Sequence, residues 1–251
     1  MTLKFSEKTH RYWLDRRPCP GVTTLLKGYP KPAIPYWSAR TVAEYVADNE
    51  EAVDQLRRAG RAPMVAALKS IPWQVRDDAA LRGSQVHDLA EQVIAGAEVE
   101  VPERHLGLVQ GYVDWLDTES VTPLLTERPV ANRGHWYCGK FDLLAEIDGV
   151  TWLLDLKTSR GVYGENAMQL LAYGRAEVYL ADDADPDSEQ PMPAIDRYGV
   201  VHVEDGMSTL HPVRPDQHDA AFADFLHAAW LYRAKDRIDN YFIDPYQEET
   251  A

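Results

Sequence analysis

The dipeptide Asp148-Gly149 constrains the fold of this chain more than any other short feature. It lies between two alternating apolar runs, and Asp-Gly in that setting is the strongest local signal for a β-hairpin closed by a type I′ turn. A two-residue turn also fixes which residues face each other. We therefore predict a hairpin over residues 139–157 in which Asp142 lies directly opposite Asp155.

The two faces of this predicted hairpin differ in polarity. The apolar face suits packing under a helix and consists of Phe141, Leu143, Ala145, Ile147, Val150, Trp152, Leu154 and Leu156. On the other face the two aspartates meet, and like charges about 5 Å apart destabilise a strand pair. A divalent cation that prefers carboxylate oxygens, Mg²⁺ or Mn²⁺, would relieve the repulsion. Lys157 on the same face would then hold a water or stabilise a developing anion.

A less specific interpretation stays open for the same charges. Exposed aspartates are ordinary on a solvated strand face, and Lys157 would then only pair with one of them. Three charged groups in register on one face favour the cation site. The sequence also predicts that the two cysteines, Cys19 and Cys138, are reduced thiols, because they form no CxxC pair and are too few for a four-thiolate site.

Charge is distributed unevenly along the chain. The net charge is −14 over 251 residues, yet residues 1–82 hold 14 Lys and Arg against 9 Asp and Glu, whereas residues 83–251 hold 12 against 31. A polyanion would therefore bind at the N-terminal third, although a solvated helical face explains the same basic residues equally well. The candidates are Arg57, Arg58, Arg61, Lys69, Arg76 and Arg82.

Apolar periodicity predicts an α/β protein, with a central mixed sheet flanked by helices and an N-terminal helical addition. No apolar run reaches the roughly 18 residues of a membrane helix, and the N-terminus has no signal-peptide pattern, so we expect a cytoplasmic protein without membrane contact. The predicted elements are a hairpin and a brief helix from Val22, two helices within 36–70, helices over 73–95 and 102–116, a strand over 121–130, the hairpin, a helix over 163–180, a mobile acidic loop over 181–193, a second hairpin over 198–213, and a closing helix over 215–241.

Two predicted helices carry polar residues one turn apart. His87 lies between Gly83 and Glu91 on one helical face, where it would reach a metal if that face meets the sheet; a lone histidine is otherwise more often a surface group. Gln169 and Tyr173 follow the hairpin and would donate hydrogen bonds to a phosphate. The alternative is a surface amide beside a partly buried aromatic ring.

Taken in order, these residues resemble the PD-(D/E)XK nuclease superfamily in its RecB-like branch, which is similar to phage exonucleases and CRISPR-associated nucleases. The motif residues are His87, Gly139, Asp142, Asp155, Leu156, Lys157, Gln169 and Tyr173. The opening segment HRYWLDRRPCPGVTTLL and Tyr36-Trp37 resemble phage-encoded members more weakly. Several relatives hold an iron–sulfur cluster with four cysteines; this chain has two cysteines, so we expect no cluster.

The resemblance implies a restriction-endonuclease-like core of αβββαβ order and a role for each matched residue. Asp142, Asp155, His87 and the Leu156 carbonyl would bind Mg²⁺ or Mn²⁺, and Lys157 would position or help deprotonate the attacking water. The implied DNA contacts are Gln169, Tyr173, Ser159 and Arg82, with Thr158 as a further hydroxyl. Glu127 and Glu91 are possible accessory carboxylates.

The resemblance also implies an activity and a division of the chain. We expect residues 1–82 to form a hairpin and helical region that walls a DNA channel, and residues 83–251 to form the nuclease core with its C-terminal helix. The expected function is an exonuclease that leaves 5′-phosphates during phage or bacterial DNA recombination, repair or processing. The alternatives are an endonuclease or junction resolvase, and a non-cleaving DNA-binding or assembly protein. DNA is the expected partner, with a homo-oligomer or a recombination protein left open.

Overall fold

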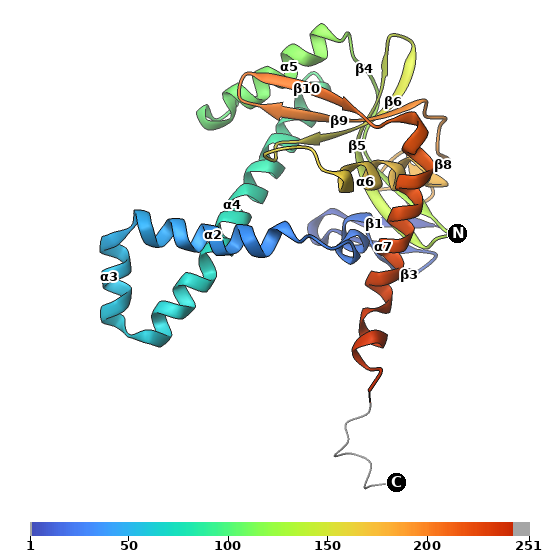
Figure 1. The fold of residues 1–251 in the computed structure, drawn as a ribbon. Coiled ribbons are helices and arrows are strands. Elements are labelled where there is room, and N and C mark those ends of the chain that lie inside the picture. The colour runs from blue at the N-terminus through green and yellow to red at the C-terminus, as the bar shows by residue number, and fades with distance from the viewer. Residues whose placement is uncertain (1, 243–251) are drawn as a thin grey trace, which may run out of the picture. The chain divides into compact units, whose positions relative to one another are not determined.

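The computed structural model describes residues 2–242 and divides the chain into two units (Figure 1). The first unit combines Met1–Tyr29 with Leu89–Ala251, and the second is Pro30–Asp88. The N-terminal hairpin thus belongs to the same unit as the large sheet, whereas the sequence-based division had grouped it with the helices. Within residues 2–242, no helix combines the length and apolar character needed to span a bilayer.

A small antiparallel sheet opens the first unit. Its strands are β1 (Leu3–Ser6), β2 (Arg11–Leu14) and β3 (Arg17–Cys19), with a 3₁₀ turn η1 (Glu7–Thr9) between the first two. Alternate residues point inward, so Leu3 and Leu14 form a buried cluster with Cys19. The short helix α1 (Val22–Leu25) and the 3₁₀ turn η2 (Leu26–Gly28) follow, as the brief helix predicted from Val22.

A seven-stranded mixed sheet forms the centre of the first unit, with the strand order β10-β9-β6-β5-β4-β7-β8. The strands are β4 (Thr122–Asn132), β5 (Tyr137–Ile147), β6 (Val150–Lys157), β7 (Val178–Leu180), β8 (Glu189–Pro191), β9 (Arg197–Glu204) and β10 (Met207–Pro212). Strands β6 and β9 pair in parallel, and the other neighbours pair antiparallel. A parallel pair needs a crossover, which contains helix α6 (Gly164–Gly174).

Helices cover this sheet, which confirms the predicted mixed α/β class. Helix α5 (Leu106–Thr118), preceded by the 3₁₀ turn η3 (Glu103–His105), packs against β9 and β10. Helix α6 packs against β5, β6 and β9, and also contacts α7 (His218–Asp239), which follows the 3₁₀ turn η4 (Pro215–Gln217). Figure 1 shows α5 and α6 on different sides of the sheet. A core cluster of buried residues lies between the sheet, α6 and α7.

The second unit contains helices only. These are α2 (Ala33–Asp48), α3 (Glu50–Ala59) and most of α4 (Arg61–Ile94). Gly60 separates α3 from α4, with a φ of +103° that favours glycine. The predicted break between residues 70 and 73 was wrong: α4 continues through Pro72, since good helix formers on both sides outweigh a cost of about 3 kcal/mol for one internal proline.

The segment after α6 also differs from the prediction. The helix expected over 163–180 ends at Gly174, and its last residues form β7 instead. The acidic stretch 181–193, predicted as a mobile loop, contains β8, which pairs with β7. Glu189 in β8 accepts hydrogen bonds of 2.8 and 3.0 Å from Arg133. Residues 189–191 are therefore held by backbone pairing with β7 and by the contact between Glu189 and Arg133. The low apolar content of the segment did not predict this strand.

Candidate active site

The central hairpin has the register that its turn predicts. Asp148 and Gly149 have φ values of 51° and 74°, as a type I′ turn requires. Strands β5 and β6 pair residue by residue from Ile147 opposite Val150 to Leu143 opposite Leu154. The hairpin therefore places Asp142 and Asp155 at its open end, one position beyond the last of these pairs.

At that open end the strands separate, and the two aspartates make different contacts. The backbone N–H of Leu156 donates to Oδ2 of Asp142 at 2.8 Å, so this carboxylate takes the place of a strand acceptor. The alternation of β5 also changes here, because Phe141 packs in the same cluster as Leu144 and Leu153. Our prediction that Phe141 shares the face of Leu143 was therefore wrong, since a regular alternation does not hold through Asp142.

Asp155 is neutralised by groups of the protein itself. Its side chain is 1% exposed and lies with Oδ2 at 2.5 Å from Nζ of Lys157. The Nε2 amide of Gln169 on α6 donates to Oδ1 of Asp155 at 3.0 Å. From the sequence we expected a divalent cation to relieve the repulsion between the two aspartates, with pairing to Lys157 as the alternative; in the structure, a lysine, an amide and a backbone N–H supply compensation. Carboxylates with such partners are stable when buried.

Lys157 stays protonated in this setting. Burial lowers the pKa of Lys157, but the negative charges of Asp155 and Asp142 outweigh burial and hold the pKa above the ordinary lysine value. A charged ammonium is a hydrogen-bond donor and a positive charge, not a proton acceptor. Of the two roles expected for Lys157, positioning a water or stabilising an anion fits this environment better than deprotonation.

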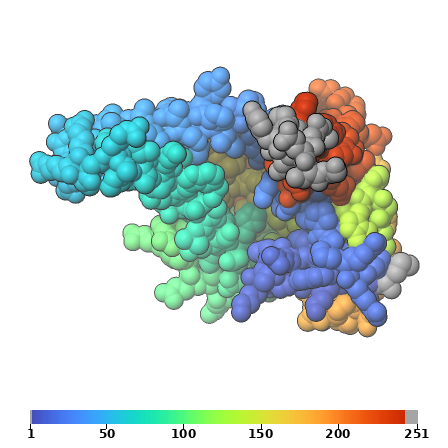
Figure 2. Space-filling model, turned by 90° about the horizontal axis from the view of Figure 1, so that it is seen from below, coloured from blue at the N-terminus to red at the C-terminus, as the bar shows by residue number. Residues whose placement is uncertain are grey.

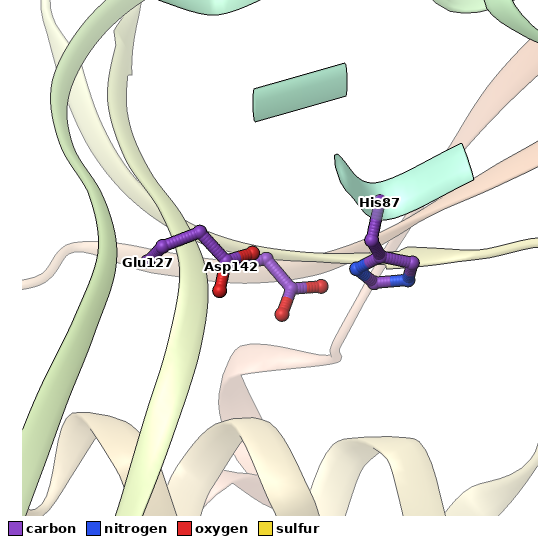
Figure 3. A group of neighbouring side chains, drawn as sticks. All are labelled: His87, Glu127 and Asp142. Atoms are coloured by element: carbon purple, nitrogen blue, oxygen red, sulfur yellow. The ribbon is translucent and has the colours of Figure 1, made fainter. Parts of the chain in front are cut away.

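Three side chains converge next to this pair (Figure 3). His87, Glu127 and Asp142 each offer one ligand atom, and these atoms lie within 4.8 Å of one another. His87 belongs to α4, two residues before the first unit resumes at Leu89. Two carboxylates and an imidazole are donors that Mn²⁺ and related divalent cations accept. Asp155 is not a member of this group, whereas Glu127, predicted only as an accessory carboxylate, is.

The backbone of β4 brings Glu127 into this group. Thr126 pairs with Leu143 and Arg128 pairs with Phe141, so Glu127 falls between these pairs, opposite Asp142. Its φ of 52° is unusual for a residue other than glycine, and it marks the position where the strand departs from regular geometry. Such departures in strands often redirect a side chain toward a functional site.

Sequence reasoning missed two neighbours of these carboxylates. Nζ of Lys140 lies 2.9 Å from Oε2 of Glu127, and this contact anchors the glutamate beside Asp142. Tyr112 on α5 is buried, and its burial, followed by the charges of Asp142 and Glu127, raises its pKa. Lys140 lies two residues before Asp142 in the strand, and that spacing was a usable signal. The sequence around Tyr112 gives no signal of this position, because the proximity of Tyr112 to Asp142 and Glu127 depends on how α5 packs.

Gln169 and Tyr173 point back to the strands, as predicted, but they hydrogen-bond to other side chains of the protein. Nε2 of Gln169 donates to Tyr173 Oη at 3.1 Å as well as to Asp155. Tyr173 is 4% exposed, and burial raises its pKa well above the ordinary tyrosine value, so its phenol is neutral. In this structure these residues hold Asp155 in place, and the ring of Tyr173 has almost no surface for a phosphate.

Close packing under Tyr173 requires the glycine of the motif. A Cβ built on Gly139 would lie 2.3 Å from Cε1 of Tyr173, which is far below van der Waals contact. We expect Gly139→Ala to lower the free energy of unfolding by about 1–3 kcal/mol, because the buried ring must shift. Thermal unfolding measures this. Gly164→Ala on α6 is the matched control, since nothing lies within 4 Å of its added Cβ; equal melting temperatures for the two variants would contradict the argument.

The remaining predicted residues lie apart from this network or contribute only backbone atoms. Ser159 donates its hydroxyl to the carbonyl of Gly161 at 2.8 Å, a local contact in the link after β6. Leu156 contributes its N–H to Asp142, as described above. Arg82 is an exposed residue of α4 in the second unit.

Comparison of the sequence with models of protein families finds no match, and no curated protein matches the chain either.

Proposed function

We propose that this protein is a metal-dependent DNA nuclease of the PD-(D/E)XK type, acting as an exonuclease in DNA recombination, repair or processing. The observation that carries the proposal is the position of Asp142. Its carboxylate accepts the Leu156 N–H and belongs to the group with His87 and Glu127, beside the buried Asp155–Lys157 pair. The order α5, β4, β5, β6, α6 and β9 supports the proposed core, because it matches the αβββαβ sequence of elements when the three-residue strands β7 and β8 between α6 and β9 are counted as an insertion.

The residues fit a divalent cation, with a ligand set different from the one expected. His87, Glu127 and Asp142 would hold Mg²⁺ or Mn²⁺. The imidazole favours Mn²⁺ over Mg²⁺, which prefers oxygen ligands and retained waters. In this arrangement Asp155 acts through Lys157 and Gln169, which it holds beside the metal group.

Each side chain has a defined part in the proposed hydrolysis. A cation bound by these residues would lower the pKa of a water molecule and neutralise charge on the scissile phosphate. The charged ammonium of Lys157 stabilises the developing negative charge, and Asp155 fixes the position of that ammonium. Gln169 keeps Asp155 from rotating. Attack of the water on phosphorus would break the P–O3′ bond, which leaves a 5′-phosphate on one product and a 3′-hydroxyl on the other.

Digestion of labelled DNA tests this function. We expect the protein to release nucleotides from linear single-stranded or duplex DNA in Mn²⁺ and Mg²⁺, and to release none in EDTA. Covalently closed circles separate an exonuclease from an endonuclease or resolvase, because only the latter cut a molecule without ends. Linear DNA that stays intact with either metal, while it binds the protein, would favour the non-cleaving alternative and contradict the proposal.

A further inference from the structure

The N-terminal sheet presents a solvent face with an unusual composition. Lys4 in β1 pairs with Trp13 in β2, and Trp13 pairs with Pro18 in β3, so these residues form one row across the sheet. The opposite face carries the buried residues, including Leu3 and Leu14. An indole opposite a lysine on an outer face has no part in that core. The N-terminal segment is visible in dark blue at the surface in Figure 2.

Basic residues surround this indole. Trp13 lines a hollow of about 220 Å³ with Lys4 and Arg16, and a second hollow of about 430 Å³ with Arg11 and Pro18. Lys4, Arg11 and Arg16 are exposed, and within the described part of the chain no ion pair involves them. The face is thus an aromatic platform with uncompensated positive charge on both sides.

The acidic residues of this segment are engaged elsewhere. Residues 1–29 contain six Lys and Arg but only two Asp and Glu, although the whole chain has a net charge of −14. Asp15 pairs with Arg133, and Glu7 lies 3.7 Å from Lys140, so both acids contact cations of the large sheet. The outer face therefore keeps its positive charge, which complements a polyanion.

The same strand also adjoins the candidate active site. Tyr12, the residue before Trp13, is half-buried, and burial, followed by the charges of Cys138 and Glu127, raises its pKa. Lys140, which contacts Glu127, lies 5.8 Å from the ring of Phe5 in β1. The inner face of the small sheet thus neighbours Glu127, while its outer face carries Trp13.

We propose that this outer face binds single-stranded DNA, with a nucleobase stacked on Trp13 and the flanking phosphates on Lys4, Arg11 and Arg16. Aromatic rings combined with basic side chains are the general means by which proteins bind single strands without sequence preference. Exposed bases distinguish a single strand from a duplex, whose bases are already stacked. The role of this platform rests on the proposed function: the platform holds the DNA strand whose end enters the active site.

Binding measured in EDTA tests this platform without any hydrolysis. Fluorescence anisotropy of a short labelled single strand should show about tenfold weaker binding for Trp13→Ala, because stacking on an aromatic residue is worth roughly 1–3 kcal/mol per base. Trp13→Phe should retain most of the affinity. Trp230→Ala is the control, since Trp230 is an exposed tryptophan on α7 with the guanidinium of Arg237 near its ring, whereas Trp13 is half-buried in β2. Circular dichroism of each variant checks folding.

A second variant tests the phosphate contacts independently of the indole. For Arg11→Ala, the slope of log affinity against log salt should decrease by about 0.7, the value for one contact to a single strand. Unchanged binding by Trp13→Ala and an unchanged slope for Arg11→Ala would overturn the platform. An equal loss for duplex and single-stranded DNA would overturn base stacking. Trp13-dependent binding by a wild-type protein that never degrades DNA would refute the nuclease and leave the platform standing.

Discussion

Asparagine in place of Asp142 is expected to abolish metal-dependent DNA hydrolysis without unfolding the protein. The amide oxygen can still accept the Leu156 N–H, which donates to Asp142 Oδ2 at 2.8 Å, so this contact between β5 and β6 is kept. The charge that the cation needs is lost. Loss of a residue that only supports a metal ligand costs about 10- to 100-fold, so loss of a ligand itself should exceed about 100-fold in the hydrolysis rate. Release of label from linear DNA in Mn²⁺ measures it.

Asp196→Asn is the control for this substitution. Oδ2 of Asp196 accepts the backbone N–H of Thr151 at 3.0 Å, so it makes the same type of contact at the turn end of the hairpin. We expect this variant to keep the wild-type rate. If Asp142→Asn also hydrolyses DNA at the wild-type rate, Asp142 does not hold the catalytic cation.

Methionine in place of Lys157 should lower both activity and stability. Asp155 is 1% exposed, and removal of the ammonium leaves its charge buried without the cation beside it, although Gln169 still donates a hydrogen bond to it. Breaking a buried ion pair costs about 3–5 kcal/mol, and the low end applies because the Lys157 side chain keeps 22% of its surface exposed. Hydrolysis should fall by about 100- to 1,000-fold, because a donor to the developing charge is lost. Urea unfolding and DNA digestion measure the two effects.

Two further variants separate stability from catalysis. In Asp155→Leu/Lys157→Met neither charge of this pair remains, so most of the lost stability should return while hydrolysis stays as low as in the Lys157→Met variant. Lys235→Met removes an exposed lysine that pairs with Asp239 at 2.6 Å, and it should change neither property. Recovery of hydrolysis in the double variant would show that Lys157 has only a structural role.

Local signals predicted the parts of the site that depend on neighbouring residues in sequence. Asp148-Gly149 set the register of β5 and β6, because a two-residue turn leaves one way to align the strands. The helical spacing of Gln169 and Tyr173 placed both on the face of α6 that reaches Asp155. Neither inference needed any knowledge of distant segments.

The missed parts depend on contacts between distant segments. Glu127 has a left-handed backbone and lies opposite Asp142 because β4 pairs with β5. The sequence around Glu127 contains no glycine that would predict this irregularity. The even alternation assumed for β5 fails at the same position, because Phe141 packs in the cluster that contains Leu144 and Leu153. Strand β8 was missed because its three residues are held by pairing with β7 and by Arg133 rather than by an apolar pattern.

The most direct test of the account is to locate a bound cation. Crystals of the full chain soaked in Mn²⁺ and measured at the manganese absorption edge give an anomalous signal only where the metal binds. The account predicts the strongest peak among the side chains of His87, Glu127 and Asp142. Ordered crystals at saturating Mn²⁺ with no peak there, or with the metal bound away from Asp142, would contradict it.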